Sequence, residues 1–155
     1  MNRSRLVLCV SFVAVMAYML VVYWLSDMPS ITMDIQTSIA NLLRRDVFEH
    51  CLEFIPLGLL TANLFLLLFK TRPALHVSLA AFVTSTFYGV FDEIHQSLVP
   101  NRVWDFGNSM FDVLGDAIGA LIGIMLFLSV YFIYRTGVLK RGRQSTVEGL
   151  IIVEE

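Results

Sequence analysis

Four long apolar segments alternate with short polar stretches along the sequence. By residue number they cover about 6–25, 47–69, 74–97 and 111–134. A helix needs about 20 apolar residues to cross the hydrocarbon core of a bilayer, so each segment is long enough to span a membrane. Pro73 follows Lys70 and Arg72 and is expected to end one helix and begin the next. The pattern predicts an all-α fold, a polytopic membrane bundle of four transmembrane helices.

The stretch between the first two spans has a different pattern. Within residues 31–48, Ile31, Ile35 and Ile39 recur at helical spacing, and polar residues such as Asp34 occupy positions between them. This periodicity predicts an amphipathic helix that lies on the outer side of the membrane or caps the bundle.

The composition agrees with a membrane protein and excludes other classes. Hydrophobic residues make up 57% of the 155-residue chain and charged residues 15%, and the mean hydropathy is +0.72, well above that of a water-soluble domain of this size. The formal net charge is -2, and no cluster of basic residues alternates with aromatic ones, which excludes nucleic-acid binding. Cys9 and Cys51 fall near opposite faces of the predicted bilayer, so both are expected to be free, buried thiols.

Basic residues are unequally distributed over the two sides of the predicted bundle. Eight of the 11 Lys and Arg residues fall on the side of the N-terminus, namely Arg3, Arg5, Lys70, Arg72, Arg135, Lys140, Arg141 and Arg143. Arg44, Arg45 and Arg102 fall on the other side. The positive-inside rule therefore predicts that both termini are cytoplasmic. The first apolar run is longer than a signal-peptide core and is expected to be retained, and residues 144–155 are expected to form a flexible cytoplasmic tail.

Ionisable and amide side chains of three spans are predicted to meet at the outer end of the bundle. They are Glu49, His50 and Glu53 on the second helix, Asp92, Glu93 and Gln96 on the third, and Asp112 and Asp116 on the fourth. Residues three or four apart share a helix face, so each helix can present a pair of polar side chains. An ionised side chain costs about 2.5 to 3.5 kcal/mol at the bilayer centre, and less near the interface. The concentration predicts either a polar pocket or an interfacial salt-bridge cluster that holds the helix ends together.

The types of residue in this group indicate which ligands and reactions suit a pocket there. Its excess of carboxylates favours a bound divalent cation. His50, next to carboxylates, is a candidate general base or nucleophile, whereas His76 and His95 are expected to be structural or exposed. Arg102, in the outer loop, is the best candidate for holding a phosphate group. The Walker, GxSxG, HExxH and CxxC motifs of soluble enzymes do not occur.

Several of these residues form a pattern that resembles the signature of a known family. The run Asp-Glu-Ile-His-Gln-Ser-Leu-Val-Pro-Asn-Arg at residues 92–102, followed by Asp112, Gly119 and Gly123, resembles the signature of the VanZ-like family of small bacterial membrane proteins. The run His-Cys-Leu-Glu-Phe at residues 50–54 is similar to the second-helix motif of that family. The resemblance covers about residues 49–123. Two positions depart from the family pattern: Asp116 stands where Asn is usual, and Phe54 stands where Tyr is common.

This resemblance implies a VanZ-like four-helix domain at residues 1–143, in the bacterial cytoplasmic (inner) membrane. It also implies a link to the cell envelope, because the founding member confers low-level resistance to the glycopeptide teicoplanin. The family is similar in helix layout and polar residues to membrane enzymes that exchange or hydrolyse lipid headgroups, such as phosphatidylserine synthases. The expected function is therefore hydrolysis or exchange of lipid or lipid-linked headgroups at the outer leaflet, with an effect on glycopeptide susceptibility as a further expectation.

Two hypotheses remain for the polar group. In an enzyme, the catalytic residues are His50, Glu93 and Asp92, and the substrate-binding residues are Gln96, Arg102, Glu53, Asp112 and Asp116, with a divalent cation as the candidate cofactor. In the alternative, a non-enzymatic protein binds lipid-linked cell-wall precursors or the antibiotic in the same cavity. A transporter is disfavoured because four helices lack the paired broken helices of that class. The sequence leaves the lipid and the oligomeric state open.

Overall fold

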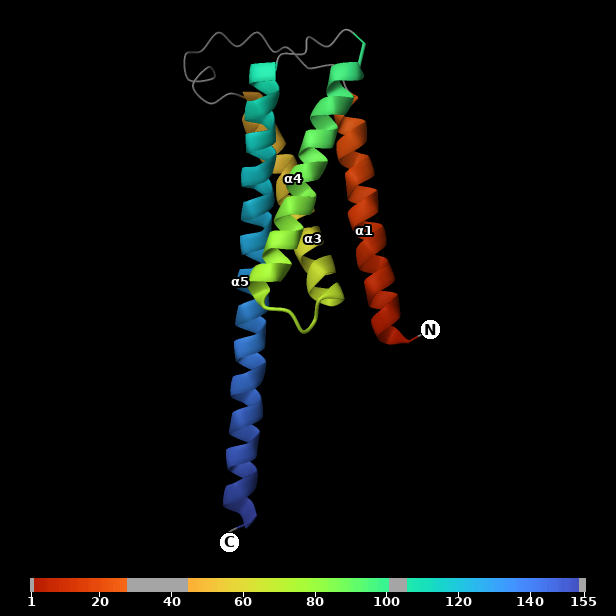
Figure 1. The fold of residues 1–155 in the computed structure, drawn as a ribbon. Coiled ribbons are helices and arrows are strands. Elements are labelled where there is room, and N and C mark those ends of the chain that lie inside the picture. The colour runs from red at the N-terminus through yellow and green to blue at the C-terminus, as the bar shows by residue number, and fades with distance from the viewer. Residues whose placement is uncertain (1, 28–44, 101–105, 154–155) are drawn as a thin grey trace.

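A computed structural model describes residues 2–27, 45–100 and 106–153. It contains four helices: α1 (Arg3–Ser26), α3 (Arg45–Leu68), α4 (Ala74–Leu98) and α5 (Phe106–Val153). Figure 1 shows α3 and α4 between the first half of α5 and α1, and both of them pack against each of these two helices. Each helix contains a segment long and apolar enough to cross a membrane. The predicted all-α fold with four spans is confirmed, whereas the amphipathic helix predicted within 31–48 falls largely on residues outside the described ranges.

Local signals define the helix ends that the sequence predicted. The side chain of Asn2 accepts a hydrogen bond from the Ser4 backbone N–H at 3.4 Å and caps the start of α1. Pro73 is the residue that precedes α4, and its ring cannot continue the preceding helix, so α3 and α4 are joined by a short turn at 69–73. This turn lies at the same end of the bundle as the N-terminus (Figure 1).

The fourth helix is longer than the sequence predicted. The apolar pattern placed its end near residue 134 and a flexible tail at 144–155, but α5 remains helical to Val153. Its 48 residues correspond to roughly 72 Å, and Figure 1 shows its C-terminal part extending well beyond the other helices. The apolar span within it is Ser109–Val138. The difference has a simple cause: hydropathy marks where a helix leaves the membrane, and no proline after Pro100 stops the helix there.

The distribution of side chains is that of a membrane protein. The largest fully buried side chains include Phe54, Leu57, Val22 and Ile124, which form the interior together with polar residues. The outer surface is covered with large apolar side chains such as Phe87, which is 73% exposed. The buried polar group contains His50, Asp92, Glu93, Gln96, Asp112 and Asp116. A soluble domain does not expose apolar surface on this scale while it buries its carboxylates, so the surrounding medium is lipid.

Small residues set the close approach of α3 and α5. A Cβ atom added to Gly58 would overlap the backbone of Ala120, and one added to Gly119 would overlap the carbonyl oxygen of Cys51. Gly123 is likewise closed in by the Ile55 backbone. All three obstacles are backbone atoms of the other helix, which cannot rotate away. The glycines therefore fix the distance between the helix that carries His50 and the helix that carries the two aspartates.

Hydrogen bonds inside the bundle connect the other helices. Asn63 of α3 donates to Ser11 of α1 at 3.0 Å, and the hydroxyls of Thr61 and Ser85 lie 3.0 Å apart between α3 and α4. The Tyr18 hydroxyl of α1 donates to the Glu53 carbonyl at 2.9 Å. Such bonds between transmembrane helices contribute about 0.6 to 2 kcal/mol each. Two of them hold α1, a helix without glycine, against α3, and the third joins α3 to α4.

Candidate functional site

A group of buried polar side chains occupies the end of the bundle opposite the N-terminus. His50 lies in the second turn of α3, Glu93 near the end of α4, and Asp112 and Asp116 in the second and third turns of α5. All four are less than 9% exposed, and Asp116 is fully buried. The structure thus brings together four of the predicted site residues from three helices, at the depth that the sequence suggested.

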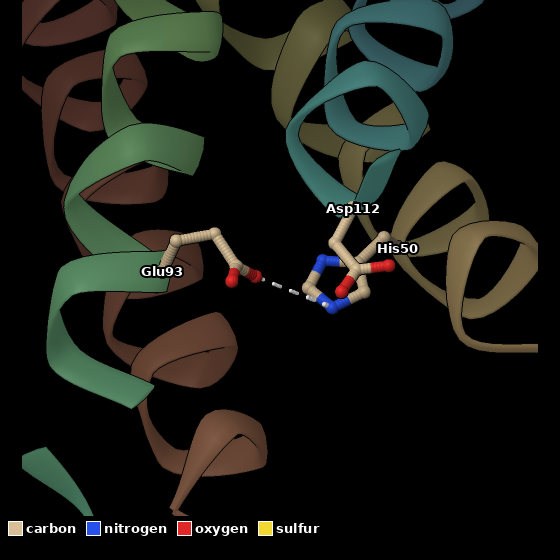
Figure 2. Close-up of side chains that lie close together, drawn as sticks. All are labelled: His50, Glu93 and Asp112. Carbon is tan, nitrogen blue, oxygen red and sulfur yellow. Dashed lines mark ion pairs between the residues drawn. The ribbon is translucent and has the colours of Figure 1, made fainter. Parts of the chain in front are cut away.

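His50 is oriented by a carboxylate. Its Nδ1 lies 2.9 Å from Oδ1 of Asp116. Because an ionised carboxylate only accepts hydrogen bonds, Nδ1–H is the donor in this contact. Nε2 faces Glu93, whose Oε1 is 3.8 Å away, as the dashed line in Figure 2 shows. The ring is therefore held in one orientation, with Nε2 turned toward the other acidic side chains.

Three of these residues form a candidate metal site. His50, Glu93 and Asp112 each offer one ligand atom, and these atoms all lie within 4.8 Å of one another. Figure 2 shows the carboxylates of Glu93, from α4, and Asp112, from α5, beside the imidazole ring. Two ligands bonded to one cation at about 2.1 Å lie at most about 4.2 Å apart, so a small inward movement closes the site. One nitrogen and two carboxylate oxygens form a donor set that divalent metals accept.

Two buried oxygen atoms in the group lack hydrogen-bond partners among the described residues. They are Oε1 of Glu93 and Oδ2 of Asp116. The Glu93 carboxylate also accepts a hydrogen bond from the Ser109 side chain. Buried polar atoms are rarely left unpaired, because each costs about 1 to 3 kcal/mol. An unpaired carboxylate oxygen that points toward His50 and Asp112 fits a place where a cation binds.

A family model described as VanZ/LLP1 matches residues 5–133. The chain belongs to the VanZ/LLP1 family. The match includes the membrane-spanning parts of α3 and α4 and most of those of α1 and α5, so the chain is a multi-pass membrane protein of this family. No curated protein and no solved structure matches the chain.

The departure of Asp116 from the expected VanZ-like pattern keeps the contact with His50. The Asp116 Oδ1 atom accepts the Nδ1–H bond, and the amide oxygen of an asparagine can accept the same bond. What the aspartate adds is a second oxygen and a negative charge in a fully buried position. At the other departure, Phe54 is fully buried, and its ring lies 6.3 Å from that of Tyr88 in the apolar interior.

Asp92 and Gln96 have different partners from Glu93. One carboxylate oxygen of Asp92 accepts a hydrogen bond from the Ser26 hydroxyl of α1, and the other accepts one from the Gln96 side chain at 2.7 Å. Both residues are buried. Asp92 therefore connects α4 to α1, and Gln96 binds Asp92 from the next turn of α4. The predicted roles of both residues in catalysis and substrate binding stay predictions.

The hydrogen bonds of Asp92 with Ser26 and Gln96 are predicted to stabilise the protein. Replacing Asp92 by alanine removes the acceptor of Ser26 and Gln96 and is expected to lower the free energy of unfolding by about 2 kcal/mol. The control is Asp27→Ala, because Asp27 is an exposed carboxylate at the same end of α1 that pairs with His95 at 3.1 Å. Both are measured by SDS-induced unfolding of the detergent-solubilised protein, followed by circular dichroism. Equal stability of the Asp92 variant and the natural protein would exclude a structural role for this contact.

The remaining predicted residues are located as follows. Glu53 lies three residues after His50 on α3, half-buried, outside the three-residue metal group. Arg102 lies outside the described residues, so its role as a phosphate ligand stays a prediction. His95 is structural, as expected, since it pairs with Asp27 and its ring stacks on Tyr23. Cys9 and Cys51 are free thiols, as expected, but the expected burial is wrong, because Cys9 is exposed and Cys51 is only partly buried.

The sequence analysis missed three residues that support the site. Ser109 contacts Glu93, Ser26 contacts Asp92, and Gly89 leaves room for Asp116, whose carboxylate a Cβ at Gly89 would overlap. A signal for Gly89 existed, because it lies four residues before Glu93 and therefore on the same side of α4. No signal existed for the two serines, which contact their partners only through the packing of separate helices.

Proposed function

We propose that this chain is a membrane enzyme that binds a divalent cation through His50, Glu93 and Asp112. With this cation it hydrolyses or exchanges a phosphate-linked headgroup of a membrane lipid or a lipid-linked envelope precursor. The observation that supports the proposal best is the orientation of His50. Asp116 holds its Nδ1, so Nε2 faces carboxylates that come from two other helices. A carboxylate that orients a metal-binding histidine in this way is a recurring feature of metalloenzyme sites.

The ligand types indicate which cation to expect. Imidazole nitrogen is a good ligand for Zn²⁺ and is also found at Mn²⁺ sites, whereas Ca²⁺ takes oxygen ligands almost exclusively. The three carboxylates of Glu93, Asp112 and Asp116 carry excess negative charge in a buried position. A divalent cation offsets this charge, which is otherwise costly away from water. Zn²⁺ or Mn²⁺ is therefore expected in preference to Ca²⁺.

The chemistry follows from what such a cation does. Held by His50, Glu93 and Asp112, it would supply positive charge to stabilise the negative charge that develops on a phosphoryl oxygen as the bond to the headgroup breaks. The oxygen of a water molecule forms the new bond to phosphorus in hydrolysis, and that of an incoming alcohol does so in exchange. The proton of this nucleophile passes to a carboxylate of the group, and the protonated carboxyl group then gives it to the departing headgroup oxygen. No redox partner is needed.

The position of the group favours a lipid-derived substrate. His50 and Glu93 lie within about two turns of the ends of the spans Val47–Leu68 and Ala74–Leu98, where lipid headgroups are found. The excess of basic residues on the side of the N-terminus supports an orientation in which this end faces the outer leaflet. A substrate anchored in the membrane reaches such a site by lateral diffusion.

The test is headgroup turnover by the purified protein in liposomes that contain labelled envelope lipids. We expect headgroup release or exchange that requires Zn²⁺ or Mn²⁺ and stops on chelation. Glu93→Gln keeps the size of the side chain but removes a charged ligand, and is expected to lower turnover about 100-fold or more. Glu49→Gln is the matched control, since Glu49 precedes His50 on α3 and its side chain is exposed.

Two different results would contradict the proposed function. Unchanged turnover in Glu93→Gln would show that the group is not the site. Lipid binding without turnover in the natural protein would instead support the non-enzymatic alternative, in which the protein occupies lipid-linked precursors.

A further inference from the structure

A pocket lies at the end of the bundle opposite the candidate metal site. It has a volume of about 110 Å³ and is lined by Ser4, Arg5 and Leu8 of α1, Leu67 of α3 and Lys70, which follows α3. We call it the basic pocket. The start of α1 and the turn between α3 and α4 lie together at this end (Figure 1), far from His50 along α3. The basic pocket is therefore separate from the candidate metal site.

The depth of the basic pocket corresponds to the headgroup layer. The first apolar span begins at Arg3 and the second ends at Leu68. Arg5 and Lys70 thus lie at the boundary where apolar spans give way to polar chain, and Leu8 and Leu67 lie next to it on the membrane side. A ligand in this position meets two cations at its polar end and two leucines where an acyl chain would begin.

The charge around the basic pocket is uniformly positive. No acidic residue occurs in residues 2–26 or 54–91, which include all five lining residues. Arg3 and Arg72 add two further cations close to it in sequence. The first turn of α1 also places the positive end of its helix dipole at this end. Neither segment therefore supplies a carboxylate to pair with Arg5 and Lys70, and an anion has to come from outside them.

We propose that the basic pocket binds the phosphate group of an anionic phospholipid. Arg5 and Lys70 bind the phosphate oxygens, Ser4 adds a hydroxyl donor, and the first acyl carbons pack on Leu8 and Leu67. The leucines favour a lipid over free inorganic phosphate, which has no apolar part. This proposal does not depend on the proposed enzymatic activity.

The test compares lipid selectivity in bilayers of phosphatidylcholine. The full-length protein is reconstituted with a trace of spin-labelled phosphatidylglycerol or spin-labelled phosphatidylcholine, and the protein-bound fraction is measured by electron paramagnetic resonance. Arg5→Gln/Lys70→Gln is expected to lower the preference for phosphatidylglycerol at least about tenfold, since each cation near a lipid phosphate contributes about fivefold. The matched control is Arg3→Gln/Arg72→Gln, which removes the same charge from the same end without changing a lining residue. A zwitterionic bilayer has little surface potential, so the control is expected to lose no more than about threefold.

Three outcomes decide the proposal. Equal losses in the two double variants would overturn it, because the preference would then come from surface charge alone. Displacement of the lipid by inorganic phosphate at millimolar concentration would also overturn it, in favour of a free-phosphate site. If the double variant does not fold, Lys70→Gln alone is used, since Lys70 lies outside the helices. It is expected to lose about fivefold, and an unchanged preference in this variant would equally contradict the proposal.

Discussion

Replacing Gly119 by leucine is expected to destabilise the bundle by about 3 kcal/mol or more. A Cβ atom at this position would overlap the carbonyl oxygen of Cys51 and crowd its backbone carbon atoms. These are backbone atoms of α3, so the helices must move apart to accommodate the side chain. Leucine is a better helix former than glycine by nearly 1 kcal/mol, which offsets only part of this loss.

The loss of packing is expected to reach the candidate site. Gly119 follows Asp116 by less than one turn of α5, and Cys51 is the neighbour of His50 on α3. Moving the two helices apart at this level lengthens the 2.9 Å contact between His50 and Asp116. The variant is therefore expected to lose divalent-cation affinity in the fraction of protein that still folds.

Gly137→Leu provides the matched control in the same helix. A Cβ at Gly137 meets no atom within 4 Å, so this change is expected to leave stability unchanged or slightly raised. Both variants are measured by SDS-induced unfolding and by titration with Mn²⁺. If Gly119→Leu were as stable as Gly137→Leu, α3 and α5 would not pack at this level.

Much of the fold follows from the sequence because membrane spans depend on the length of apolar runs. The third span was predicted at 74–97 and is observed at Ala74–Leu98, since Pro73 marks its beginning. The fourth was predicted to end near 134, although the helix continues to Val153. Apolar length locates the part of a helix inside the membrane, but only a cap, a proline or a tertiary contact determines where the helix itself ends.

The candidate site was predictable in depth but not in rotation about each helix axis. Asp92 and Glu93 are adjacent in sequence, so both were placed at the outer end of the bundle as catalytic residues. Adjacent residues on a helix point about 100° apart. Asp92 consequently contacts Ser26 on α1, whereas Glu93 faces His50 on α3. The helix that a side chain faces depends on how the helices pack, and this packing cannot be derived from a single sequence.

The same limit applies to the role of Asp116. Its spacing of four residues from Asp112 predicted that both share a helix face, and they do lie in one buried group. The sequence assigned both to substrate binding. The structure distinguishes them, because Asp116 contacts Nδ1 of His50, whereas Asp112 joins His50 and Glu93 in the metal group. Such a division of roles requires the position of the imidazole ring.

Replacing His50 by alanine is expected to lower Mn²⁺ affinity more than 100-fold and headgroup turnover roughly 1,000-fold. The variant removes the nitrogen ligand and leaves Glu93 and Asp112 as two buried carboxylates without the imidazole between them. The control is His76→Ala, since His76 is exposed near the start of α4, at the end of the bundle that carries the basic pocket. Binding is measured by the loss of the free Mn²⁺ electron paramagnetic resonance signal in the presence of the full-length protein.

Variants of Asp116 distinguish a metal site from a metal-independent general base. Asp116→Ala removes the acceptor for His50 Nδ1–H and is expected to weaken Mn²⁺ binding 10- to 100-fold, whereas Asp116→Asn retains an accepting oxygen and is expected to lie between alanine and the natural residue. If His50 acts as a base without a metal, chelators leave turnover unchanged, Mn²⁺ does not bind, and the same variants reduce turnover only. A graded loss of Mn²⁺ affinity that parallels the loss of turnover across His50→Ala, Asp116→Ala and Asp116→Asn would therefore identify a metal-dependent reaction. Loss of turnover alone would leave His50 and Asp116 as a catalytic dyad.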